Sequence, residues 1–353
     1  MRTKESTGSF AEHHAFFLAR AIVVAAGLWL ACCSGCTSVP QIGHWEGPTA
    51  PAAVSFGPWS NGPPGARAVR TAHYEINTTI TDDDFLKQTA QVMEGALTEY
   101  RQLAPAVKVS DSPMQCYLFS SRAEWEAFTV QLTGPQSSIF LQINRGGYCF
   151  GDQYVAYDIG QSSTLSVAAH EGWHQFVARH FTGRLPPFLE EGLATTFETM
   201  RWQDGLPQWN LSINSQRVLG LRRSIERHAL WPLDTLVTLN AGSVVSGSGE
   251  KIDAFYSQDW AFADFLYSGE NGSRRPMLLR MIADAAAGKI RDPTGHLRRA
   301  YLGFDPAGSK PLIVDYLGGD LSHLDQSFAD IDKDFQAYMD KLAYEELMSQ
   351  YQD

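Results

Sequence analysis

Hydrophobic and polar residues follow different periods in the two halves of the chain. In the segment AHYEINTTI, residues 72–80, Tyr74, Ile76 and Ile80 share one parity, which predicts a half-buried strand. The residues that follow step by four and three positions, which predicts a helix with one core-facing side. The stripe on that side comprises Leu86, Ala90, Met93, Leu97 and Tyr100.

Three further segments extend the first half of this pattern. MQCYLFS at 114–120 predicts a second strand, and SRAEWEAFTVQL at 121–132 predicts a short helix. Two short aromatic and β-branched runs in GGYCFGDQYVAYDIG flank Gly151 and Asp152, which predicts a hairpin or a kinked edge strand. An edge strand beside a catalytic helix is able to hold an extended peptide by main-chain hydrogen bonds.

Helical periodicity dominates from residue 162 onward. The predicted helices cover 164–181, 211–229, 252–267, 275–287 and 325–348. Strands followed by helices predict an α+β fold, with an N-terminal mixed β-sheet and a mainly α-helical C-terminal subdomain. We place the first part at residues 67–183 and the second at residues 184–348.

The amino-terminal residues resemble a targeting signal. Arg20 precedes the apolar run AIVVAAGLWLACC, which is short for a bilayer span, so residues 1–36 are predicted to be a signal peptide. The segment CSGCTS resembles a bacterial lipobox with Cys36 as the lipidated residue, although Cys33 stands where Leu or Val is usual. We therefore expect export, either as a cell-envelope lipoprotein anchored to the membrane through Cys36 or as a secreted protein. Residues 37–66 are rich in Pro and Gly and are predicted to be a tether.

Composition and charge narrow the set of partners. The 353-residue chain has 28 basic and 39 acidic residues and a formal charge of −11, and it has no basic block, so we expect no nucleic acid partner. Of its five cysteines, Cys116 and Cys149 lie in the body of the chain. In an exported protein they form either one disulfide or two free thiols, and the sequence leaves both open.

The segment AAHEGWHQFVARHF, residues 168–181, carries the candidate chemistry. Residues four apart share a helix face, so His170 and His174 are able to direct imidazole nitrogens at one zinc ion. Glu171 lies one position round the helix, where it cannot comfortably be a ligand but is able to take a proton from water on the metal. The alternative is a helix with two hydrogen-bonded histidines and no metal.

Catalytic zinc takes three protein ligands and keeps one open position, so a third ligand is needed. His180 completes the metzincin pattern H-E-x-x-H-x-x-G-x-x-H, except that Val177 replaces the glycine. Without that glycine the helix continues, and six residues at about 100° each turn His180 about 240° away from His174. We expect a helix-end histidine here, and a metzincin-like peptidase with His180 as third ligand is the lesser alternative.

The other source of a third ligand is LPPFLEEGLATTFE, residues 185–198. An H-E-x-x-H motif followed by proline, an aromatic residue, leucine and E-G-x-A resembles the gluzincin metallopeptidases. The resemblance implies a zincin-like fold, Zn²⁺ as cofactor and Glu171 as general base. By the same match, zinc is bound by His170, His174 and Glu191.

Three neighbours of that glutamate have expected roles of their own. Gly192 is small enough to let the histidine helix and the helix that carries Glu191 approach closely. Glu190 remains open as the ligand in place of Glu191. Glu198 shares the helix face of Glu191, and it either hydrogen-bonds the far nitrogen of a liganding histidine or is an ordinary exposed residue.

The segment AFYSQDWAFADFLYSG, residues 254–269, is apolar almost all round, which predicts a buried helix. Its order Y-x-Q-x-W-A resembles a bacterial group of secreted gluzincin-like domains of unknown function. The resemblance implies that the Tyr256 phenol faces the metal and stabilises an oxyanion, with a hydrogen-bonded core tyrosine as the alternative. The G-x-M-E-N type loop of gluzincin aminopeptidases is missing.

Together these patterns predict an exported zinc-dependent metallopeptidase. It would hydrolyse peptide bonds of a peptide or protein substrate by a zinc-bound water that Glu171 activates. The alternative is an envelope-anchored, non-catalytic binding or assembly module that retains the zincin fold, because no known specificity loop is present.

Overall fold

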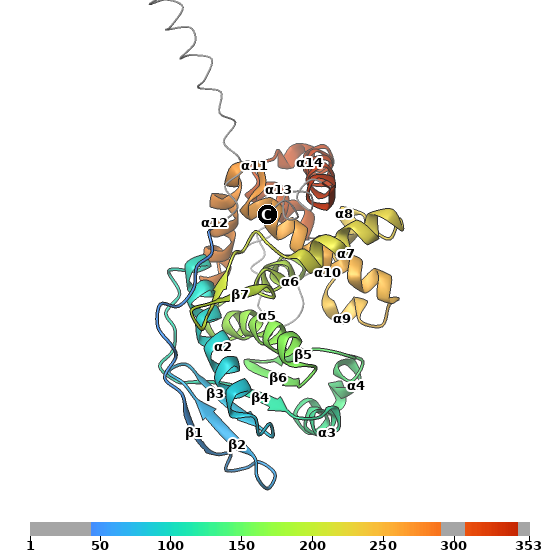
Figure 1. The fold of residues 1–353 in the computed structure, drawn as a ribbon. Coiled ribbons are helices and arrows are strands. Elements are labelled where there is room, and N and C mark those ends of the chain that lie inside the picture. Colours follow the sequence, from blue (N-terminus) through green and yellow to red (C-terminus); the bar gives the residue numbers. More distant parts are fainter. Residues whose placement is uncertain (1–43, 291–307, 345–353) are drawn as a thin grey trace, which may run out of the picture. The chain divides into compact units, whose positions relative to one another are not determined.

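A six-stranded mixed sheet forms the first half of the fold in the computed structural model, which describes residues 44–290 and 308–344 (Figure 1). Its strand order is β1-β2-β3-β4-β6-β5, with β3–β4 and β4–β6 parallel and the other pairs antiparallel. The strands are β1 Ser55–Pro58, β2 Arg67–Arg70, β3 Tyr74–Thr78, β4 Met114–Phe119, β5 Gly147–Phe150 and β6 Gln153–Tyr157. The predicted hairpin is therefore confirmed, and β5 lies at the edge of the sheet.

Helices cover both faces of this sheet. The crossover from β3 to β4 is α2 Asp83–Leu103, which begins after Asp82, whose carboxylate accepts hydrogen bonds from two backbone amides of the first turn. The predicted stripe along α2 is buried and packs with Ile76 and Tyr154 in the larger hydrophobic cluster. The opposite face, which includes Val155, is covered by α3 Arg122–Thr133. The short α4 Ser137–Phe140 follows α3.

The second half is mainly helical, which confirms the α+β prediction. The long α10 Gly249–Tyr267 packs against α6 Pro187–Thr196 and α7 Ser215–Glu226 (Figure 1). The remaining elements are α5 Gln161–His180, β7 Met200–Gln203, β8 Leu206–Trp209, α8 Leu233–Leu236, α9 Ala241–Val244, α11 Gly269–Gly272, α12 Arg275–Ala286, α13 Ser309–Tyr316 and α14 Leu324–Tyr344.

The structure tests the predictions for the tether and the two cysteines, but not those for the targeting segment. Residues 1–36, with the predicted signal peptide and Cys36, lie outside the described residues, so export and lipidation stay predictions. Within the predicted tether, residues 55–58 instead form the strand β1, which pairs with β2. Pro58 is compatible with this strand because it lies at the end of an edge strand. Cys116 and Cys149 are both free thiols. Among the helices of the described residues, none is long and apolar enough to span a bilayer.

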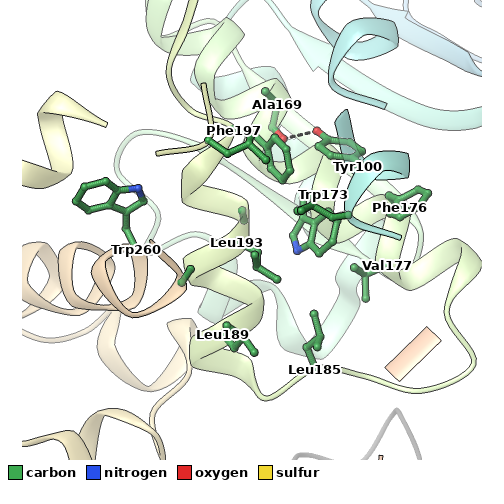
Figure 2. Packing of buried hydrophobic residues seen from close by; sticks show 14 of the residues in the cluster. Tyr100, Ala169, Trp173, Phe176, Val177, Leu185, Leu189, Leu193, Phe197 and Trp260 are labelled. Carbon is green, nitrogen blue, oxygen red and sulfur yellow. Dashed lines mark hydrogen bonds between the residues drawn. The ribbon is translucent and has the colours of Figure 1, made fainter. Parts of the chain in front are cut away.

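One side of α5 is anchored in the core. Trp173, Phe176 and Val177 are fully buried there, beside Tyr100 of α2 (Figure 2). The Tyr100 hydroxyl donates a hydrogen bond to the Ala169 carbonyl. These contacts fix the rotation of α5 about its axis, which turns its opposite side toward the candidate site.

Glu99 on α2 is a buried acid away from that site. Its Oε2 accepts a hydrogen bond from Gln102 at 3.2 Å, while its Oε1 has no hydrogen-bond partner among the described residues. Burial, together with the nearby Glu46, raises the pKa of Glu99 to about 7. The folded protein therefore binds this proton more tightly than the unfolded chain does.

Replacing Glu99 with glutamine should raise the free energy of unfolding at pH 8. The raised pKa contributes stability below about pH 4.5, and this contribution is lost as the pH rises through 7. The loss is on the order of 1–3 kcal/mol. Urea unfolding at pH 5 and pH 8 measures it, and the variant should show the smaller difference. An unchanged pH dependence would contradict the assignment.

Candidate metal site

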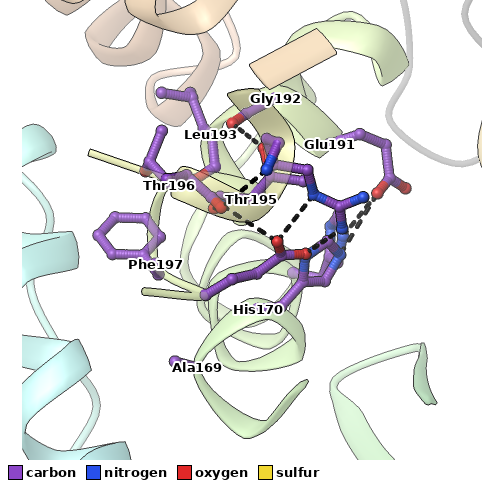
Figure 3. Close-up of polar contacts among 12 residues, drawn as sticks. Ala169, His170, Glu191, Gly192, Leu193, Thr195, Thr196 and Phe197 are labelled. Atoms are coloured by element: carbon purple, nitrogen blue, oxygen red, sulfur yellow. Dashed lines mark hydrogen bonds and ion pairs between the residues drawn. The ribbon is translucent and has the colours of Figure 1, made fainter. Parts of the chain in front are cut away.

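Three predicted side chains converge beside α5. One ligand atom each from His170, His174 and Glu191 lies within 4.8 Å of the others. The Nε2 atoms of both histidines are 3.4 Å from the same oxygen, Oε2 of Glu191. Figure 3 shows the contacts that join His170 and Glu191. The three side chains are only 10–14% exposed, so the group is a nearly buried candidate metal site.

Local helix geometry brings these residues together. His170 and His174 are four apart on α5, and their ring centroids are 5.1 Å apart. Glu191 comes from α6, which begins at Pro187 after a short connection. A Cβ on Gly192 would lie 2.2 Å from the Asp259 carbonyl oxygen, so this glycine permits close contact between α6 and α10. The sequence pattern predicted that Gly192 would permit close approach to the histidine helix α5, whereas its close contact is with α10.

The two histidine–glutamate distances fit a metal ion better than hydrogen bonds. A separation of 3.4 Å is long for a nitrogen–oxygen hydrogen bond, which has its optimum near 2.9 Å. Ligand atoms about 2.0–2.1 Å from a tetrahedral zinc ion lie about 3.3–3.4 Å apart. The two histidine–glutamate separations therefore match the spacing that a zinc ion needs, and the residues fit the metal that the motif implies.

The outer nitrogens of both histidines are held by carboxylates. Nδ1 of His170 is 3.0 Å from Oε1 of Glu198, and Nδ1 of His174 is 3.2 Å from Oε1 of Glu190. A carboxylate at Nδ1 keeps the proton there and leaves Nε2 free to bind a metal. Glu198 thus has the role expected of a hydrogen-bonding partner. Glu190 lies on the outer side of His174, while Glu191 faces both Nε2 atoms.

Arginines in turn hold these two carboxylates. Arg217 of α7 donates to Glu198 from two nitrogens, Nε at 2.9 Å and Nη2 at 2.6 Å, and Asn214 adds a third contact at 3.2 Å. Arg184 binds Glu190 at 3.0 Å. These three residues could not be predicted from the sequence, because no local spacing relates them to the H-E-x-x-H motif.

The electrostatics of the site favour a cation at its centre. Burial lowers the pKa of His170, but the adjacent carboxylates of Glu191 and Glu198 outweigh this effect and raise the pKa to about 9. Burial raises the pKa of Glu191, but His174 and His170 outweigh it and hold that pKa well below its usual range. Carboxylates also outnumber guanidinium groups around the triad. A divalent cation would therefore be strongly stabilised.

His180 lies apart from this centre. Its Nδ1 is 3.0 Å from the Phe176 carbonyl oxygen, and its Nε2 accepts a hydrogen bond from the Ser110 amide at 3.2 Å. It is the last residue of α5, because Val177 continues the helix instead of turning it. The expectation of a helix-end histidine is confirmed, and this geometry does not support His180 as the third ligand.

The triad opens onto a cavity of about 230 Å³, which Glu171 and Tyr256 also line. The Tyr256 ring centroid is 6.3 Å from that of His170, and the Arg217 guanidinium lies 5.1 Å from the Tyr256 centroid. Burial raises the pKa of Glu171, and the two neighbouring histidines only partly oppose this effect. The five site residues predicted from the sequence therefore share one cavity.

Replacing Arg217 with methionine should weaken zinc binding by about 10–100-fold, because Glu198 would lose the charge that orients it against His170. Competition with a zinc-binding dye measures the dissociation constant. Arg223→Met on the same helix is the matched control, since that arginine is half exposed and pairs with Asp253. Equal zinc affinity in both variants would contradict a role for Arg217 in positioning the ligand.

Comparisons of the chain with family models, curated proteins and solved structures gave no match. The function is therefore inferred from the geometry and chemistry of the site.

Proposed function

We propose that the protein is a zinc-dependent peptidase of the gluzincin type. The observation that carries the proposal is the convergence of two Nε2 atoms and one carboxylate oxygen at 3.4 Å separations, beside a cavity that Glu171 lines. His170, His174 and Glu191 would hold the metal. A bound zinc ion would supply Lewis acidity and lower the pKa of a bound water.

Glu171 is suited to act as general base and then as proton donor. Its carboxyl lines the cavity with the metal-binding residues, and burial raises its pKa, which favours the protonated form that would donate to the leaving amine. In the first step it takes a proton from the attacking water. In the second step the same carboxyl delivers that proton to the leaving amine, so Glu171 ends in its initial state.

Tyr256 is suited to stabilise the negative charge that develops on the substrate carbonyl oxygen. Its side chain lines the same cavity as the triad, and the guanidinium of Arg217 lies over its ring. Burial raises the pKa of the Tyr256 phenol well above its usual value, so the group keeps the proton that it would donate in a hydrogen bond. The resemblance to secreted gluzincin-like domains assigned the same role to this residue.

The substrate backbone would bind along β5. This strand lies at the edge of the sheet, and Gly147, Tyr148 and Cys149 of β5 line the cavity. An extended peptide added to the free edge would be held by main-chain hydrogen bonds, whatever its sequence. The scissile carbonyl would then lie beside the metal-binding residues.

Zinc content and peptide hydrolysis measured on one preparation test the proposal. Purified wild-type protein should hold one zinc ion per chain and cleave members of a mixed peptide library, as read by mass spectrometry. Removing the metal with a chelator should abolish cleavage, and adding Zn²⁺ should restore it. Wild-type protein that holds zinc and cleaves nothing would refute the peptidase proposal and support a non-catalytic binding module.

A further inference from the structure

The segment 134–146, which we call the strap, borders the cavity and runs between two glycines with positive φ. It contains α4 and joins α3 to the edge strand β5 (Figure 1). Gly134 has a φ of 53° and Gly146 has a φ of 142°, a range that favours glycine. The strap residues that line the cavity are Ile139, Phe140 and Ile143. The strap is therefore a piece of the cavity boundary with a glycine at each end.

The strap has few attachments to the core. Much of its backbone hydrogen bonding is internal, as in the bond from the Leu141 amide to the Ser137 carbonyl at 2.9 Å. Ile139 is 46% exposed although it lines the cavity. By contrast, α5 and α6, which carry the metal-binding residues, have most of their residues buried. The strap is therefore able to move with a small loss of packing, whereas these two helices are not.

Arg122, the first residue of α3, ties the end of the strap to the rest of the fold. Its Nη2 donates to the Leu141 carbonyl at 3.1 Å. Its Nη1 donates to the carbonyls of Ile143 at 2.9 Å and Asn144 at 3.0 Å. Its Nε bonds separately to Glu126 at 2.8 Å. One planar guanidinium thus holds three strap carbonyls, which a lysine ammonium cannot do with the same geometry.

Tyr157 of β6 adds a second tie at the same place. Its hydroxyl donates to the Asn144 carbonyl and accepts a hydrogen bond from Nη1 of Arg122 at 3.1 Å. Tyr157 is only 7% exposed, so this point of attachment is fixed by the sheet. Both ties act between α4 and Gly146. Breaking them would free the end of the strap that lies next to β5.

The size of the cavity indicates why the strap would need to move. Its volume of about 230 Å³ is below the roughly 300–1,000 Å³ of pockets that enclose a whole drug-sized ligand. A peptide extended along β5 has to place residues on both sides of its scissile bond beside the metal-binding residues. The cavity therefore has to widen, and the strap is a boundary that is suited to this movement.

We propose that Arg122 is a positioning residue that latches the strap, and that the strap opens at Gly134 and Gly146 to admit the substrate. This inference rests on the proposed function for what enters the cavity, but not for the latch itself. The hydrogen bonds from Arg122 stabilise the closed strap whether or not a ligand is bound. The latch should therefore control the rates of ligand binding and release more than the affinity.

Hydrogen exchange of the strap amides in the full-length protein tests the latch. Arg122→Lys keeps the positive charge but loses the bonds to three carbonyls, so these amides should exchange at least about tenfold faster than in the wild type. Tyr157→Phe removes the second tie and should act in the same direction by a smaller factor. Glu126→Gln is the matched control, because it removes only the 46% exposed partner of Nε, and it should keep the wild-type exchange rate.

Binding of a trialanine hydroxamate to the zinc-loaded proteins tests the opening of the strap. Surface plasmon resonance should show the association and dissociation rate constants of Arg122→Lys both raised about tenfold, because each scales with the open population. The dissociation constant should change by less than about threefold. A purely structural defect would weaken binding without faster association. Glu126→Gln should keep the wild-type rate constants.

The outcomes separate the latch, the opening of the strap and the proposed function. Wild-type exchange of the strap in Arg122→Lys would overturn the latch, and Tyr157→Phe carries the same comparison if Arg122→Lys does not fold. Faster exchange with unchanged association would overturn the opening of the strap as the route of entry. A hydroxamate that binds to none of the proteins would refute both the proposed function and this route. The expected rate changes in a protein that cleaves no peptide would support the strap and refute the peptidase.

Discussion

Replacing Glu171 with glutamine should lower kcat for peptide hydrolysis by about 10²–10⁴-fold and leave zinc content at one ion per chain. Glutamine has nearly the shape of glutamate, so it fits the same buried position on α5, but its amide cannot accept a proton from water. The metal-binding atoms of His170, His174 and Glu191 are unchanged by this substitution. Activity and metal binding should therefore separate in this variant.

Initial rates on a peptide identified from the library, together with zinc content by elemental analysis, measure this separation. Glu226→Gln is the matched control, because Glu226 is a half-exposed residue of α7 that pairs with Arg222. It should keep wild-type rates. Substantial activity in Glu171→Gln would mean that another group removes the proton, and loss of zinc in this variant would mean that Glu171 supports the metal site instead.

The parts of the site that the sequence predicted are those set by local geometry. His170, Glu171 and His174 occupy one helical turn, so their spacing alone indicates that the two histidines share a face. Glu191 lies on a different helix, and no periodicity relates it to the histidines. It was predicted only because the sequence motif around it resembles that of a known family. In the structure its carboxylate lies beside the Nε2 atoms of both histidines.

The supporting residues could not be predicted because their positions depend on packing between distant elements. Arg217 reaches Glu198 only because α7 packs on α10, which in turn packs on α6. Arg184 lies in the connection before α6, where its charge gives no sign of its partner. Charged residues are common on protein surfaces, so their type alone carries little information.

In the fold, too, elements with a long periodic pattern were predicted, whereas short elements were not. The predicted stripe on α2 is buried as expected, since a long amphipathic helix carries a strong periodic signal. Short elements were missed, among them α9 and the hairpin of β7 and β8, because four residues span too little of any period. β1 was not predicted because it lies within a Pro- and Gly-rich segment. α9 was not predicted either, although it lines part of the cavity.

Replacing Glu191, the proposed third ligand, should have the largest effect on metal binding. Glu191→Ala should weaken zinc binding on the order of 10³-fold, because it removes the only carboxylate that faces both Nε2 atoms among the described residues. His180→Ala should leave zinc affinity unchanged, since both nitrogens of His180 bind backbone groups of Phe176 and Ser110. Its expected cost is about 1 kcal/mol of stability from the lost hydrogen bonds.

Dye competition gives the zinc affinity of each variant, and thermal unfolding of the zinc-free proteins gives the stability that separates folding defects from ligand loss. Glu190→Ala adds a third comparison, with an expected 10–100-fold loss of affinity, because Glu190 orients His174 without facing the centre. If Glu191→Ala retained zinc while His180→Ala lost it, the ligand assignment would be wrong. If Glu190→Ala lost more affinity than Glu191→Ala, the two glutamates would exchange roles. The order of the three losses therefore identifies the third ligand.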